Sequence, residues 1–197
     1  MSLINVARFS ADELYEIVAT YAGFGNHHTG TPVDAQTTAW LKDVLLSLGA
    51  SVHEDWFEFD RFVCTAELRV GDQVVPALPV FYSAHGDWRT KDLSVVEANV
   101  AVGERGTGLA VALAMAAELA ADHHVTLSAC SGHEFDHIGL KHYLAGREVV
   151  GWPVVHLGGS SLFHTTADTA AATTPQAMAL AADVAIDAAR LFLDSHR

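Results

Sequence analysis

Five stretches of the chain place apolar residues at the spacing of a helix with one buried face. The first follows Ser10, where S-A-D-E supplies the serine and the acidic residue of a capping box. The second has Pro32 in its first turn and Gly49 as its stop. The third begins at Gly106 and is almost wholly small and apolar, which is typical of a buried helix packed against a sheet. The pattern predicts helices at residues 10–21, 32–48, 106–121, 138–144 and 175–192.

Other stretches have the pattern of strands, with a turn at Gly71-Asp72 between two of them. Two of these stretches, residues 125–130 and 152–157, are apolar on successive residues, which predicts central strands buried on both faces. The predicted strands are residues 52–59, 64–70, 74–80, 125–130 and 152–157. Because helices and apolar strands alternate, we expect one α/β domain over residues 1–197. Its architecture would be a three-layer α/β/α sandwich around a mostly parallel mixed central sheet.

Length and charge narrow the class of protein. A chain of 197 residues, half of them apolar, can bury a core without disulfides, and Cys64 and Cys130 form no disulfide framework. The net charge of −13, with 11 basic residues, argues against nucleic acid and anionic membranes as partners. No apolar run approaches the roughly 18 residues of a membrane span, and no secretory signal is visible. We expect a cytoplasmic protein; a removed leader and a homo-oligomer both stay open.

Candidate chemistry is concentrated after the predicted strand at residues 125–130. His133-Glu134-Phe135-Asp136-His137 matches H-E-x-x-H, the zinc motif of metalloproteases. That motif needs a helix, on which its two histidines share a face. Here Gly132 belongs to a turn, and the longer metzincin pattern is absent. The match therefore leaves a second interpretation of the same residues open.

Several segments, in order, resemble the M28 family of zinc aminopeptidases, whose fold also carries glutaminyl cyclases. G-H-E-F-D-H-I-G-L-K-H-Y-L, residues 132–144, is similar to the family's G-E-E-x-G-x-x-G-S-x-x-Y-L. G-E-R-G-T-G-L-A, residues 103–110, looks like its D-N-A-S-G-v-A. G-W-P-V-V-H-L and F-H-T-T-A-D-T, residues 151–157 and 163–169, look like its G-i-P-v-v-x-L and F-H-T-p-A-D-T. The resemblance covers nearly the whole chain.

The resemblance implies a role for each matching residue. Glu104 stands at the place of the metal-bridging aspartate, Glu134 at that of a glutamate ligand and His164 at that of the last histidine ligand. His133 takes the place of the glutamate that acts as general base, and a neutral imidazole can accept a proton from water. The family's N-L-D segment has no counterpart. Three protein ligands and a water molecule are the usual shell of one catalytic zinc ion, so a single zinc is expected, although a site with two zinc ions stays open.

Other residues have weaker assignments. His85-Gly86-Asp87 matches the family's H-x-D, which would make His85 a further ligand and Asp87 its support. Asp168 would orient His164. His137 and His142 are expected on a helix surface.

The function that the resemblance implies is zinc-dependent hydrolysis of an amide or peptide bond in a small molecule or short peptide. A non-catalytic relative that serves as a binding or assembly module is an alternative, because the base glutamate is replaced. A cyclase-type acyl-transfer enzyme with one zinc is another.

Overall fold

The computed structural model describes residues 8–25, 27–60, 66–77, 102–147 and 168–195. These residues are mostly helical, and their two strands form one antiparallel hairpin. The elements are α1 (Ala11–Gly23), α2 (Pro32–Ser47), β1 (Ala66–Val70), β2 (Gln73–Ala77), α3 (Val102–Leu119), the 3₁₀ turn η1 (His133–Phe135), α4 (Ile138–Leu144), the 3₁₀ turn η2 (Ala170–Ala172) and α5 (Pro175–Ser195).

Local signals in the sequence account for the helix ends. Ser10 caps α1 through a complete capping box, as predicted. The Thr31 side chain caps α2, Pro32 occupies its first turn, and Gly49 follows its end with a φ of 77°. The five predicted helices are confirmed, and α4 has the predicted bounds. The largest difference is at α3, which begins at Val102 rather than at Gly106.

The chain forms two compact units. One consists of Met1–Glu54, Val96–Ala129 and Glu148–Arg197, and the other of Asp55–Val95 and Cys130–Arg147. We call them the helical unit and the second unit. The prediction of a single domain over residues 1–197 is not tested by this division and stays a prediction.

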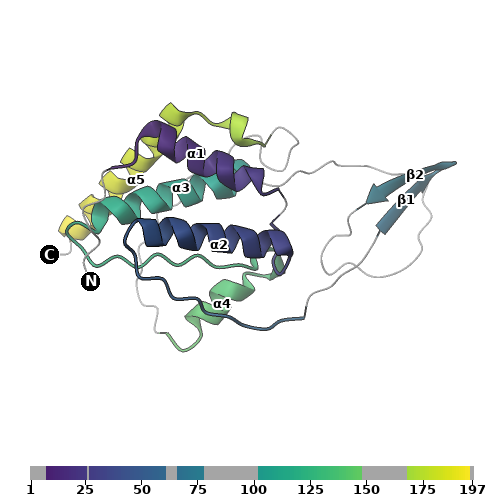
Figure 1. Cartoon of the computed structure of the whole chain (residues 1–197), viewed down its shortest axis with the longest axis horizontal. Coiled ribbons are helices and arrows are strands. Elements are labelled where there is room, and N and C mark those ends of the chain that lie inside the picture. The colour runs from purple at the N-terminus through teal and green to yellow at the C-terminus, as the bar shows by residue number, and fades with distance from the viewer. Residues whose placement is uncertain (1–7, 26, 61–65, 78–101, 148–167, 196–197) are drawn as a thin grey trace. The chain divides into compact units, whose positions relative to one another are not determined.

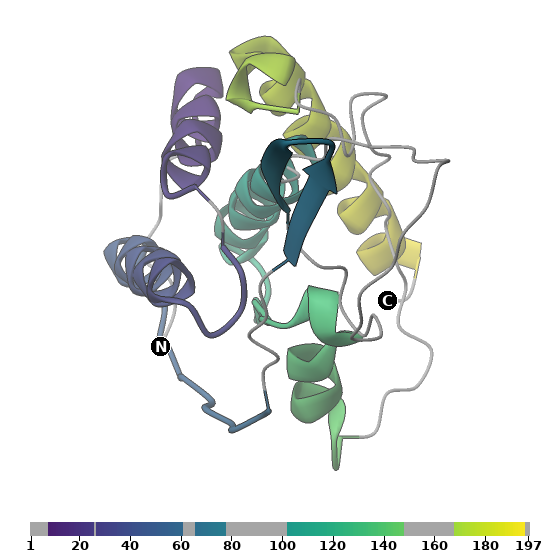
Figure 2. The same cartoon turned by 90° about the vertical axis from the view of Figure 1, so that its right-hand side faces the viewer.

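The core of the helical unit lies where α1, α3 and α5 pack against one another. Figure 1 shows these three helices side by side, and Figure 2 shows them from a direction 90° away. Small side chains on α3 and α5 let the helices approach closely. Half-buried apolar residues of α2 pack against this core. The buried core residues are Leu14, Ile17, Val18, Ala110, Val111, Leu113, Ala114, Met178, Ala182 and Ala185.

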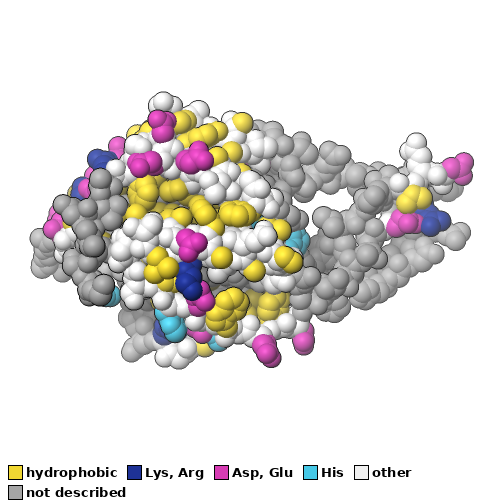
Figure 3. Space-filling view, in the orientation of Figure 1, with side chains coloured by type: hydrophobic (Ala, Val, Ile, Leu, Met, Phe, Trp, Pro, Cys, Tyr) yellow, Lys and Arg dark blue, Asp and Glu magenta, His cyan; other side chains and the backbone are white. Residues whose placement is uncertain are grey.

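Helix α5 also carries apolar side chains on its exposed side. Leu180, Val184 and Leu191 are 65%, 53% and 73% exposed. Their spacing of four and seven residues places them on one stripe of the helix. On the face shown in Figure 3, acidic side chains lie among apolar ones over the helical unit.

The strands of the second unit pair as predicted around Gly71-Asp72. Residues Ala66 and Ala77 are opposite one another at the open end of the hairpin, and Val70 and Gln73 are opposite at the turn. Gly71 has a φ of 61°, which suits a tight hairpin turn. Of the predicted strands at 64–70 and 74–80, the described residues form strand throughout, and β2 begins one residue earlier than predicted. Residues 64–65 and 78–80 lie outside the described residues.

The predicted α/β/α sandwich is wrong, because the described residues are helical and hold no central sheet. Residues 125–130 form no strand. Val125 and Leu127 are half-buried, whereas Thr126 and Ser128 are exposed. Burial thus alternates over residues 125–128, and both Ala129 and Cys130 are exposed. The side chain of Leu127 packs against the helical core, so this segment is covered on one face by helices and not by a sheet.

Two further strand predictions have different outcomes. Residues 52–59 are described and form no strand, because no neighbouring strand in the described part of the chain pairs with them. Residues 152–157 lie outside the described residues. The small-residue helix α3 packs against α1 and α5 instead of a sheet.

Candidate functional site

The segment that carries the candidate chemistry, residues 131–139, is a tight turn held by backbone hydrogen bonds. The N–H groups of Phe135 and Ile138 both donate to the Gly132 carbonyl at 3.1 Å. The Gly139 N–H donates to the Ser131 carbonyl at 3.1 Å. A Cβ on Gly139 would lie 2.2 Å from that carbonyl oxygen, so only glycine fits there. The backbone at residues 131–139 is therefore closely packed on itself.

Two consecutive residues of this turn have left-handed backbone conformations. Asp136 and His137 have φ values of 56° and 55°, which are uncommon for residues other than glycine. The Asp136 carboxylate pairs with the Lys141 ammonium one turn into α4. This hydrogen bond and the charge of Lys141 hold the pKa of Asp136 below its ordinary value of 3.8. Such local strain is a recognised feature of functional sites.

The left-handed residues bring two imidazoles together. The rings of His133 and His137 lie 4.5 Å apart between centroids and are nearly perpendicular, at 86°. Both side chains are exposed. The H-E-x-x-H residues are not on one α-helix, since η1 ends at Phe135 and α4 begins at Ile138, so the condition for the metalloprotease motif is not met in its usual form.

The predicted metal ligands are not brought together by the described side chains. Glu104 belongs to the first turn of α3 and Glu134 to η1, and nothing is described of either side chain. His164, His85 and Asp87 lie outside the described residues. In the part of the chain that the structure describes, no three histidine, cysteine or acidic side chains form a group able to hold a metal ion. The predicted ligand set thus stays a prediction.

Asp168 is the one predicted supporting residue whose side chain is described. It is 1% exposed and directly precedes Thr169, the N-cap of η2. A carboxylate so deeply buried is held for a structural or positioning purpose. Its predicted partner His164 lies outside the described residues.

The turn also contacts an aromatic segment that the sequence did not connect with it. Phe135 is buried and packs on Phe59 with ring centroids 5.3 Å apart. His142 is exposed on α4, as predicted, yet its ring stacks on Phe57 at 4.8 Å and its Nε2 lies 3.3 Å from Asp55 Oδ1. These partners are 76 to 87 residues apart in the chain, and no short-range pattern could have found them.

His27 in the helical unit is a structural histidine. The residue is 8% exposed, and its ring stacks on that of Tyr21 with centroids 4.2 Å apart. Its Nδ1 lies 2.9 Å from the Thr37 hydroxyl, which itself donates to the Val33 carbonyl at 2.8 Å. The hydroxyl proton is thus already used, so the Nδ1–H of His27 donates to Thr37.

Comparisons with protein-family models, with curated proteins and with solved structures found no match to this chain. Among the described helices, none is long and apolar enough to cross a membrane. The assignment of a function therefore rests on the residues themselves and on their chemistry.

Proposed function

We propose that this protein is a zinc-dependent hydrolase that cleaves an amide or peptide bond with a water molecule. The proposal rests on the residues by which the chain resembles the M28 aminopeptidases. The observation that supports it best is the exposed His133 imidazole, held beside Glu134 in a closely hydrogen-bonded turn. A base must reach both solvent and substrate, and a rigid backbone keeps it in position.

The proposed roles follow the chemistry of each side chain. Glu104, Glu134 and His164 would hold one zinc ion, with His85 as a further ligand, because carboxylates and imidazoles are the usual donors for zinc. When bound, the zinc would supply Lewis-acid polarisation of the water and the carbonyl group. His133 accepts a proton from the attacking water and returns it to the leaving amine. Asp168 and Asp87 orient ligands.

Alanine substitutions at His133 and Glu134 should separate the proposed roles of the two side chains. His133→Ala should retain bound zinc and lower turnover by about 10²–10⁴-fold, the usual contribution of a general base. Glu134→Ala should lose the zinc, because it removes a ligand. Metal content of the purified variants and hydrolysis of aminoacyl amides measure both effects. His124→Ala, which alters an exposed histidine outside the turn, is the matched control and should change neither.

Other outcomes would contradict these roles. If His133→Ala and His137→Ala both lose zinc, while Glu134→Ala keeps it and is inactive, the two adjacent imidazoles are the ligands and Glu134 is the base. If the protein binds no zinc and all variants behave alike, it is a non-catalytic module. Cyclised products without hydrolysis would identify the acyl-transfer enzyme instead.

A further inference from the structure

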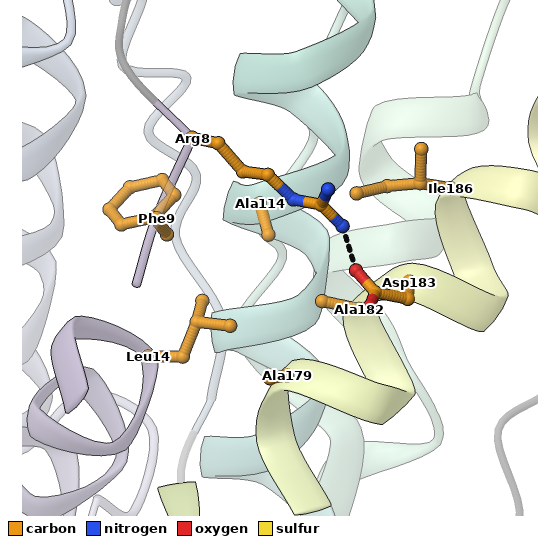
Figure 4. Close-up of a pocket in the computed structure, with 8 residues that line it drawn as sticks. All are labelled: Arg8, Phe9, Leu14, Ala114, Ala179, Ala182, Asp183 and Ile186. Atoms are coloured by element: carbon orange, nitrogen blue, oxygen red, sulfur yellow. Dashed lines mark hydrogen bonds and ion pairs between the residues drawn. The ribbon is translucent and has the colours of Figure 1, made fainter. Parts of the chain in front are cut away.

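A small pocket opens on the helical unit. It has a volume of about 150 Å³ and is lined by residues of α1, α3 and α5 and of the segment before α1. Ala114, Ala179 and Ala182 line it, and their short side chains leave the space between larger neighbours open. Leu14 and Ile186 complete an apolar wall, as Figure 4 shows. A volume of this size suits one small hydrocarbon group, since engineered cavities of roughly 150 Å³ bind benzene.

The pocket also carries one pair of opposite charges. The guanidinium of Arg8 reaches over the pocket and pairs with the carboxylate of Asp183 on α5 (Figure 4). Both side chains are well exposed, at 59% and 50%. An ion pair so open to water contributes little stability, so either partner can change to another ion at small cost. An apolar cavity thus lies beside one accessible cation and one accessible anion.

We infer that this pocket binds a free α-amino acid with an apolar side chain. The α-carboxylate would pair with Arg8, whose planar guanidinium suits bidentate binding of a carboxylate. The α-ammonium would pair with Asp183, and the hydrocarbon side chain would fill the alanine-lined space. A zwitterion satisfies both charges at once, which a simple acid or amine does not. This inference does not depend on the proposed hydrolase activity.

The ligand series that tests it uses L-leucine, N-acetyl-L-leucine, L-leucinamide and glycine. L-Leucine carries all three groups. N-acetyl-L-leucine lacks the ammonium, L-leucinamide lacks the carboxylate and glycine lacks the hydrocarbon side chain. Two-dimensional ¹H–¹⁵N NMR titrations of the full chain measure each affinity. L-Leucine should give saturable shifts, and each of the other three should bind about tenfold more weakly or worse, because each loses one charged or apolar contact. Equal affinities across the series, or no saturation by L-leucine, would overturn the inference.

Variants provide the second test. Arg8→Gln and Asp183→Asn should each weaken L-leucine binding about tenfold, and Ala179→Leu, which fills the pocket, should abolish it. Arg190→Gln is the matched control: it breaks the 2.6 Å ion pair between α5 and Glu118 on α3 without altering the pocket lining. Circular dichroism checks the folding of each variant. If a variant fails to fold, the ligand series with the wild-type chain decides alone. Unchanged binding in all three folded variants would place the ligand elsewhere and refute the inference.

Discussion

Ser10 and Glu13 exchange three hydrogen bonds at the start of α1. The Glu13 N–H donates to the Ser10 hydroxyl oxygen at 3.2 Å, and the Ser10 N–H and hydroxyl both donate to Glu13 Oε2 at 2.7 Å. The bond from the Ser10 backbone, followed by that from its hydroxyl, holds the pKa of Glu13 below its ordinary value of 4.5. The folded chain therefore binds this proton less readily than the unfolded chain, and the capping box is linked to pH.

We expect Ser10→Ala to lower the free energy of unfolding by about 1 kcal/mol at pH 7, the usual effect of losing an N-cap. Because the pKa of Glu13 is lowered on folding, its contribution is present above pH 4.5 and lost as the pH falls through the lower folded value. The difference between variant and wild type should shrink below pH 4.5. Urea unfolding at several pH values measures it, with Ser47→Ala, a serine near the end of α2, as control. A pH-independent difference would contradict this linkage.

Glycines in two elements should respond in opposite ways to the same substitution. Gly139 in α4 has no room for a Cβ beside the Ser131 carbonyl oxygen, whereas a Cβ on Gly108 in α3 would meet nothing within 4 Å. Gly108→Ala should therefore stabilise the chain by roughly 0.5–1 kcal/mol, because alanine favours the helix. Gly139→Ala should destabilise it by more than about 1 kcal/mol, because rigid backbone must move.

Denaturant unfolding of both variants measures these changes. Amide hydrogen exchange at Gly139, whose N–H bonds to Ser131, locates the effect in the turn. If Gly139→Ala changed neither the free energy of unfolding nor the amide exchange at residue 139, the turn would be less closely packed than the contact at Gly139 indicates.

The helices could be predicted from sequence because their signals are local. Ser10, Pro32 and Gly49 mark helix ends through contacts within one turn. The rings of His133 and His137 were expected to be adjacent only on an α-helix, yet two left-handed residues bring them together without one. Backbone reversals of this kind, carried by an aspartate and a histidine rather than glycine, leave a weak trace in the sequence.

The packing of the elements on one another was harder to predict from the sequence than the helices themselves. Residues 125–130 are largely apolar, which fits a central strand, but a strand exists only where a partner pairs with it. Likewise, the alanines of α3 predict burial without specifying a sheet or other helices as the partner. The contact between His142 and Asp55 depends on tertiary structure in the same way. At this scale, each missed feature depends on residues that are far apart in the chain.

The apolar stripe on the exposed side of α5 has a consequence for colloidal behaviour. Apolar stripes on neighbouring molecules attract one another, and the net charge of −13 at pH 7 opposes their approach. That repulsion vanishes near the isoelectric point of about 5.2. Turbidity should therefore be greatest near this pH. The double variant Leu180→Lys, Leu191→Lys should be less turbid there, because the two substitutions remove apolar surface from the stripe. Turbidity unaffected by the double substitution would assign the association to another surface.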